Sequence, residues 1–154
     1  MRITDRLKAE HGVFLRQLKT LERLLEEGAS AEALAAVVAA ITDAEEHHSA
    51  LEDRVLYPAL VRVLGPEEAG LKAVAREHAR LRELSSAILS GRFEGKDVAD
   101  YARLAREHFE HEIHGLFVMA EEWISDEDLK RMANWNVDHT FEAMGRPAPW
   151  KEKS

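Results

Sequence analysis

Apolar residues recur every three or four positions along most of this chain, as they do on one face of an α-helix. No segment shows the sustained alternation of apolar and polar residues that is typical of a half-buried strand. Glycine, proline and helix-capping residues divide the helical pattern into four long segments. We therefore predict an all-α protein with long helices at residues 3–27, 31–64, 66–89 and 96–124.

The connections between these helices are short, which favours an up-down-up-down antiparallel four-helix bundle. Gly28 closes the first helix, and Ser30 can cap the second. Gly65 and Pro66 separate the second helix from the third, and Pro66 suits the first turn of a helix. Each long helix is therefore expected to pack beside the one that follows it.

A shorter fifth helix is predicted at residues 126–144, because Ser125 is followed three residues later by Asp128 in a variant capping box. We expect this helix to pack on one end of the bundle, with residues 146–154 as a loose tail. The side chains expected to anchor the helix and the tail are Trp123, Trp135 and Trp150.

The length of 154 residues is typical of one domain. Hydrophobic residues make up 45 % of the chain, which is enough to form a core. In the expected organisation, residues 1–125 form the bundle and residues 126–154 pack against it.

Charge and the absence of cysteine narrow the function classes. With 21 Lys and Arg against 29 Asp and Glu, the net charge is −8, which argues against nucleic acid or an anionic membrane as a partner. Without cysteine, disulfides, thiolate catalysis and sulfur-ligated metals are excluded. The longest apolar run, residues 33–41, is too short to cross a bilayer, and the charged N-terminus lacks a signal-peptide core. We expect a cytoplasmic protein.

Four of the eight histidines fall at one depth in the predicted bundle. The first two lie about 16 and 17 residues from the loop that joins their helices, roughly 25 Å at 1.5 Å per residue. The other two match each other in the same way, and two glutamates lie one turn after a histidine. The groups that meet at this level are His11, His48, Glu52, His78, His108 and Glu112.

These six side chains share their helix faces with apolar residues and should point inward. Four buried imidazoles and two buried carboxylates would be costly without partners or a metal. Imidazole and carboxylate donors without thiolate suit iron, manganese or zinc. With two histidines per metal and two bridging carboxylates, the set can form a dinuclear centre of the kind that helix bundles house. The alternative is a hydrogen-bonded polar layer that only fixes the register of the helices.

The sequence around these residues resembles the hemerythrin-like family, also called HHE cation-binding domains, over residues 3–124. The matching stretches are Glu10-His11, residues 47–58 (HHSALEDRVLYP), Glu77-His78 and residues 108–117 (HFEHEIHGLF). The two longer stretches also resemble each other at an offset of 60 residues. The resemblance implies a non-haem di-iron centre with oxygen or water bridging, and with the same six residues as its ligands.

One departure from the family bears on function. Oxygen-carrying hemerythrins have two histidines on the third helix, spaced by four, whereas the partner positions of His78 hold Val74 and Arg82. With one ligand fewer, the second iron would have an open position, and open positions are where substrates bind metals. The resemblance therefore implies binding or reduction of a small oxidant (O2, peroxide or NO) rather than reversible oxygen storage.

Three functions stay open at this point. The first is a di-iron protein that reduces a small oxidant, with peroxidase-like or catalase-like turnover. The second is a non-enzymatic sensor or store of iron or oxygen, and the third is an interaction bundle without metal. Manganese or zinc can replace iron in either of the first two, because all three metals accept the same donors.

Several other polar residues lie near the predicted centre. Glu45, one turn before His48, is a candidate acceptor behind a ligand, proton relay or alternative ligand, or else a carboxylate at the rim. Arg82 is interpreted as a surface arginine that can also guard an access route, and Tyr101 as a core residue. The histidines expected at flank or surface positions are His47, His111, His114 and His139.

Overall fold

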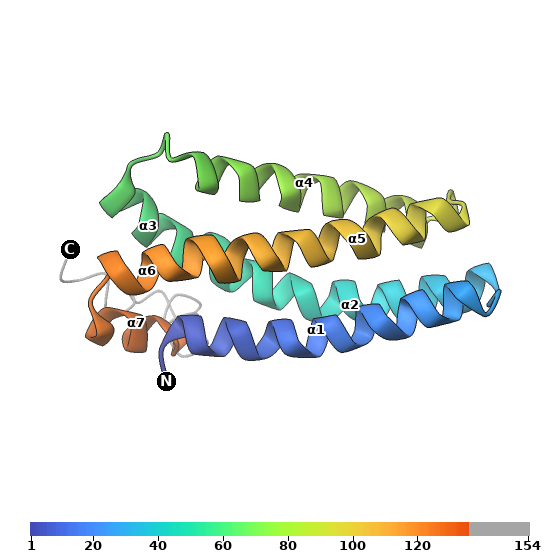
Figure 1. The fold of residues 1–154 in the computed structure, drawn as a ribbon, viewed down its shortest axis with the longest axis horizontal. Helices are drawn as coiled ribbons and strands as arrows, with labels where there is room; N and C mark the ends of the chain where they lie inside the picture. The colour runs from blue at the N-terminus through green and yellow to red at the C-terminus, as the bar shows by residue number, and fades with distance from the viewer. Residues whose placement is uncertain (136–154) are drawn as a thin grey trace, which may run out of the picture.

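The computed structural model describes residues 1–135, and these residues form helices joined by short turns, with no strand among them (Figure 1). The predicted all-α class and helical bundle are confirmed. The α-helices are α1 (Ile3–Glu26), α2 (Ala31–Leu51), α3 (Tyr57–Leu64), α4 (Ala69–Leu89), α5 (Gly95–His111), α6 (Phe117–Trp123) and α7 (Asp126–Met132). Two π-helical segments, η1 (Glu52–Leu56) and η2 (Glu112–Leu116), join α2 to α3 and α5 to α6.

Four long helical rods lie side by side (Figure 1): α1, α2–η1–α3, α4 and α5–η2–α6. Helix α1 packs against α2 and α5, while α4 packs against α5 and α2. The short α7 lies against the N-terminal part of α1 at one end of the bundle (Figure 1). Each rod therefore touches two neighbours, and all four face one shared interior.

Capping residues explain where the helices begin. The Ser30 hydroxyl accepts a hydrogen bond from the Ala33 amide, and the Ser125 hydroxyl accepts one from Asp128, as the sequence indicated. The third long helix begins at Ala69 rather than at residue 66, because the Glu68 carboxylate caps it. Pro66 is in the preceding turn, so its predicted place in the first helical turn is wrong.

The C-terminal prediction holds only in part. Helix α7 ends at Met132, and the backbone amide of Asn134 then donates a hydrogen bond to the Arg131 carbonyl in a turn. Within the described residues the helix is therefore shorter than predicted. Trp135 is buried at the bundle end, whereas the side chain of Trp123 is 57 % exposed. The rest of the predicted fifth helix, the tail, His139 and Trp150 lie outside the described residues.

The core is divided in two by a layer of buried polar groups. One apolar cluster, which includes Leu7 and Leu60, fills the end beside α3, α6 and α7. The other, which includes Leu21 and Ile88, fills the end near the α1–α2 and α4–α5 turns. Burial of such side chains stabilises the fold by about 1.5–3 kcal/mol each. The two clusters hold the rods in register on both sides of the polar layer.

Among the described residues, no helix combines the length and apolar character that a membrane crossing requires.

Candidate metal centre

The structure brings together all six residues that the sequence singled out. Their side chains come from all four rods, and each residue is at most 4 % exposed. Among the described residues they form two overlapping groups whose donor atoms all lie within 4.8 Å of one another. One group contains His11, His48, Glu52 and Glu112, and the other contains Glu52, His78, His108 and Glu112. The two carboxylates belong to both groups. The six residues are called the six-residue cluster below.

The four imidazoles present their Nε2 atoms to the interior in two pairs. The Nε2 atoms of His11 and His48 are 3.0 Å apart, and those of His78 and His108 are 2.9 Å apart. The Glu52 Oε1 atom lies 2.9 Å from His48 Nε2. In the same way, the Glu112 carboxylate lies 3.0 Å from His108 Nε2. Each glutamate is four residues after its histidine, so one helix turn sets this contact.

The donor atoms fit a metal. Both carboxylate oxygens of Glu52 and the Oε1 atom of Glu112 are buried without a hydrogen-bond partner among the described residues. Buried carboxylate oxygens without hydrogen bonds are costly unless a cation neutralises them. Imidazole and carboxylate are the donors that iron, manganese and zinc accept. The six-residue cluster is therefore able to hold metal.

A local widening of the helix begins at each glutamate of the cluster. Glu52 is the first residue of η1 and Glu112 is the first of η2, so the regular α-helix gives way to a π turn at the point where the carboxylate enters the interior. Such π turns are rare in proteins, and many of those that occur lie at functional sites. The hydrophobic pattern did not reveal them, because apolar residues continue at helical spacing through both segments.

Two further glutamates hold imidazoles from the side facing away from the interior. The Glu10 carboxylate lies 2.7 Å from His48 Nδ1, and the Glu77 carboxylate lies 2.8 Å from His108 Nδ1. Each glutamate precedes a histidine of the cluster but contacts the histidine of the neighbouring rod. A carboxylate behind a ligand fixes the imidazole tautomer and its orientation. Both glutamates belong to the family motifs in the sequence, but this role was not predicted, since their partners lie 38 and 31 residues away.

A comparison with family models matches residues 2–142 to the hemerythrin HHE cation-binding domain. The chain belongs to this family. Neither the search of curated proteins nor the search of solved structures found a match.

The two halves of this hemerythrin domain differ in polarity around the cluster. On one side Asp53 lies 3.4 Å from His78 Nδ1, and the Tyr57 hydroxyl donates a hydrogen bond to Glu112. On the other side the Nδ1 atom of His11 is buried without a hydrogen-bond partner among the described residues, and the ring packs against Phe109. Neither Asp53 nor Tyr57 was predicted as part of the centre. Their spacing of four residues, directly after Glu52, places them on one helix face and was the available signal.

Carboxylates control the proton affinity of the hemerythrin cluster. Burial alone would lower the pKa of His48, but the negative charge of Glu52 beside it and the hydrogen bond to Glu10 raise it to about 10. The same balance of burial against carboxylate neighbours raises the pKa of His108 to about 10 and that of His78 to about 9. Because imidazole binds metal in its neutral form, a metal competes with these protons.

The other polar residues named from the sequence lie outside the six-residue cluster. Tyr101 is fully buried, and its hydroxyl lies 3.5 Å from the carboxylate of Glu45. His47 is exposed beside the ring of Trp135. The exposed rings of His111 and His114 pair with Glu77 and Glu110, respectively. The predicted flank and surface positions of these three histidines are confirmed.

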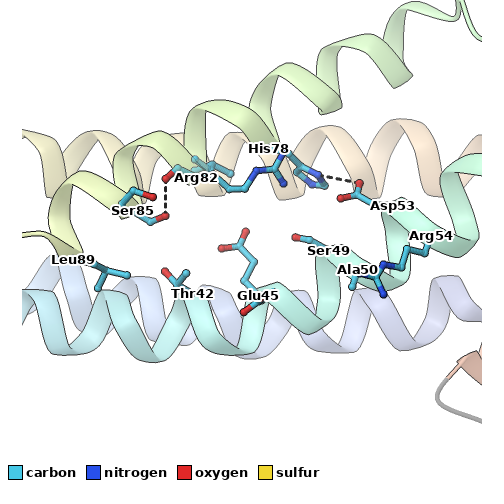
Figure 2. Close-up of a pocket in the computed structure, with 13 residues that line it drawn as sticks. Thr42, Glu45, Ser49, Ala50, Asp53, Arg54, His78, Arg82, Ser85 and Leu89 are labelled. Carbon is cyan, nitrogen blue, oxygen red and sulfur yellow. Dashed lines mark hydrogen bonds and ion pairs between the residues drawn. The ribbon is translucent and has the colours of Figure 1, made fainter. Parts of the chain in front are cut away.

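A cleft between α2 and α4 opens beside the His78 side of the cluster (Figure 2). Its volume is about 430 Å³, and His78 is the one member of the six-residue cluster that lines it. Figure 2 shows Glu45 pointing into the cleft from α2, across from Arg82 and Ser85 of α4. Arg82 is exposed at this opening, in keeping with the interpretation of it as a surface residue at an access route.

Proposed function

We propose that this hemerythrin domain holds two iron ions and binds or reduces a small oxidant such as O2, hydrogen peroxide or NO. The observation that carries the proposal is the sharing of Glu52 and Glu112 by two groups of buried donors. Two carboxylates that belong to both groups suit a pair of metal ions better than a single ion. The four rods are taken as the up-down-up-down antiparallel bundle that the family resemblance implies.

Each ion would receive two imidazoles and a share of both carboxylates. His11 and His48 would hold the first ion, and His78 and His108 the second. The second ion would have fewer protein donors than in oxygen-carrying relatives, because Val74 and Arg82 stand where a further histidine would be needed. An open position beside a polar cleft is where a small molecule would bind.

Iron would supply electrons by cycling between its ferrous and ferric states. The residues of the chain would set the geometry. Glu10 and Glu77 would orient the imidazoles of His48 and His108, while Tyr57 would hold one oxygen of Glu112 by a hydrogen bond. The surrounding apolar clusters would keep bulk water from the ions.

Metal analysis combined with anaerobic spectroscopy tests the proposal. Protein loaded anaerobically with Fe(II) should contain two iron ions per chain, and hydrogen peroxide should convert it to a ferric form with a new visible absorption. Repeated peroxide consumption would indicate turnover, whereas reversible O2 binding without consumption would favour the sensor or store. Less than one iron ion per chain, or a spectrum that peroxide leaves unchanged, would contradict the proposal.

A further inference from the structure

The metal-binding halves of the bundle are related by the 60-residue repeat. His48 and Glu52 correspond to His108 and Glu112, and η1 corresponds to η2. Each of the two rods thus carries the same donors on the same type of widened helix. A difference between corresponding positions around these donors is therefore not required to build the metal centre.

Several positions that flank the donors differ in polarity between the two rods. Four polar residues that line the cleft from the α2–η1 rod have apolar counterparts 60 residues later on the α5–η2 rod. The pairs are Thr42 with Ala102, Glu45 with Ala105, Ser49 with Phe109, and Asp53 with Ile113.

This difference leaves one interface closed and the other open. Phe109 fills the space between α5 and α1, where its ring lies 4.4 Å from His11 and 5.7 Å from Phe14, between ring centres. Ser49, the counterpart of Phe109, lines the cleft of about 430 Å³ between α2 and α4. A cavity of this size with polar walls has room for water molecules. The bundle can thus close such an interface with apolar residues, and it does so on one side only.

Glu45 is the least expected residue in this cleft. Its carboxylate points into the cleft (Figure 2), and among the described residues no cation lies within ion-pair distance of it. The hydroxyl of Tyr101, 3.5 Å away, donates a hydrogen bond to this carboxylate. Burial raises the pKa of Glu45. A half-buried carboxyl without a cation is costly to keep ionised, and the alanine at the corresponding position 105 shows that the rod does not need one.

We propose that Glu45 carries protons from water in the α2–α4 cleft to a small oxidant bound on the His78 side of the cluster. This inference rests on the proposed function and deepens it. The cleft supplies the route, since it reaches both Glu45 and His78. The Tyr101 hydroxyl holds the carboxyl in place, and the polar side chains of Ser49 and Thr42 line the water path.

The proton balance shows why such a group is needed. Reduction of one hydrogen peroxide molecule breaks the O–O bond and forms two water molecules, which consumes two electrons and two protons. The two ferrous ions supply the electrons and become ferric. Glu45 gives up one proton, regains one from water in the cleft, and gives up the second. A positioned acid of this kind accelerates proton-coupled steps by about 10²–10⁴-fold.

The kinetic test compares anaerobic Fe(II)-loaded proteins mixed with hydrogen peroxide in a stopped-flow instrument. We expect Glu45→Gln and Glu45→Ala to keep two iron ions per chain and to be oxidised roughly 10²-fold more slowly. Acetate or formate should restore a large part of the rate of Glu45→Ala, because these acids can enter the cleft and replace the lost carboxyl. Asp43→Asn, which removes the same charge from an exposed position of α2, should react like the wild type.

A second test measures the proton without any reaction. In the zinc-loaded protein, which cannot cycle its metal, infrared spectra should contain the C=O band of a protonated carboxyl at a pH above the ordinary glutamate pKa. The band should shift in D2O and be absent from Glu45→Gln, but present in Asp43→Asn.

The outcomes separate the two proposals. If the wild-type ferrous protein is not oxidised by peroxide, the proposed function fails, and the role of Glu45 fails with it. If the wild type is oxidised and Glu45→Gln is oxidised equally fast, the function stands and the present inference is wrong. If Glu45→Ala is oxidised slowly and acetate or formate does not raise its rate, the inference is also wrong. An infrared band that Glu45→Gln retains would overturn it as well.

Discussion

At the residue scale, Glu10 and Glu77 each contact a histidine of the neighbouring rod. These contacts determine which nitrogen of His48 and of His108 faces the metal centre. A neutral imidazole donates a hydrogen bond from one nitrogen and accepts at the other. By accepting from the Nδ1 atoms of His48 and His108, these carboxylates leave Nε2 as the free lone pair that faces the interior. Each glutamate also ties its own rod to the neighbouring one, so the contact serves both binding and packing.

Glu77→Gln tests the effect of such a contact on metal binding. The amide lacks the negative charge that raises the basicity of His108, so we expect the affinity for one of the two ions to fall by about 10–100-fold. Titration with Fe(II) or zinc followed by calorimetry measures this loss. Glu110→Gln is the matched control, because the ion-pair partner of Glu110 among the described residues is the exposed ring of His114. Equal affinities in the variant and the wild type would refute the role given to Glu77.

The protonation of the cluster predicts how the stability of chelator-treated, metal-free protein depends on pH. The folded-state pKa values of His48, His78 and His108 lie above the ordinary value of about 6.5. Their stabilising contribution is therefore complete below about pH 6.5 and is lost as the pH rises through about 9 to 10. Although burial opposes it, the imidazoles of His108 and His11 beside Glu112 lower the pKa of that carboxyl well below its usual range, so its contribution is lost only in acid.

We therefore expect the urea midpoint of the metal-free protein to be lower at about pH 9 than at about pH 6. The metal-loaded protein should behave in the opposite way over this range, since deprotonation of imidazole favours metal binding. A metal-free midpoint that stays constant or rises from pH 6 to pH 9 would show that the imidazoles are not protonated in the folded cluster.

The six ligand candidates were predictable from the sequence because their positions follow from helix geometry alone. His11 and His48 lie at equal depth once the turn between their helices is known, and the i, i+4 spacing places Glu52 beside His48. The roles of Glu77 and Tyr57 were not predictable in this way. Their partners lie on other rods, and the rotation of one rod against another depends on side-chain packing that periodicity does not describe.

At the element scale, the π turns explain how a helix can carry a carboxylate ligand and a polar wall together. The wider turn at Glu52–Leu56 changes the direction of the side chains that follow Glu52 relative to a regular α-helix. Asp53 can thereby lie beside His78, and the ring of Tyr57 can lie 6.0 Å from that imidazole, between ring centres. The corresponding turn at Glu112–Leu116 directs apolar residues toward α1 instead.

Ser49→Phe tests whether the α2–α4 cleft admits the oxidant. This substitution installs the residue that stands at the corresponding position 109 and should fill much of the cleft. We expect the second-order rate constant for oxidation of the ferrous protein by peroxide to fall by roughly an order of magnitude or more, because a blocked path limits access to an open metal position. The iron content should stay at the wild-type value.

Ala40→Phe is the control for Ser49→Phe, since it adds the same ring to an exposed position of α2 outside the cleft. Its oxidation rate should equal that of the wild type. If Ser49→Phe binds two iron ions and reacts at the wild-type rate, the oxidant enters elsewhere.

The helices themselves were predicted almost in full, for a physical reason that also explains the errors. Burial of one face of each long helix imposes the apolar pattern, so the patterns at 3–27 and 31–64 locate the rods within a residue or two. The start of α4 was misplaced because Pro66 and Glu68 are both suited to a helix start, and the cap that forms uses Glu68. A cap depends on one side-chain contact, which a pattern of apolar positions does not contain.

At the scale of the whole molecule, the polar layer separates two apolar clusters of the core. The carboxylates of Glu52 and Glu112 lie in this layer without enough hydrogen bonds, so the folded state bears a desolvation cost that a bound cation removes. Because the donors come from all four rods, a metal bound there links every rod to the others. Metal binding should therefore be coupled to global folding and not to one local segment.

Removal of the metal should lower the melting temperature of the entire bundle in one transition. A ligand that binds only the folded protein stabilises it by about 2.7 kcal/mol when its free concentration is 100 times its Kd, so Fe(II), manganese or zinc should raise the melting temperature in a concentration-dependent way. Calorimetry on chelator-treated protein, before and after metal is returned, measures this shift.

Magnesium is the control cation in this melting experiment, since it prefers oxygen ligands and keeps its water shell, and it should leave the melting temperature unchanged. The far-ultraviolet circular dichroism signal and the near-ultraviolet signal of the buried Tyr101 should change together, because the ions connect all four rods. Coincident melting curves with and without iron would mean that the buried imidazoles and carboxylates satisfy one another, and the layer would then serve helix register instead of metal binding.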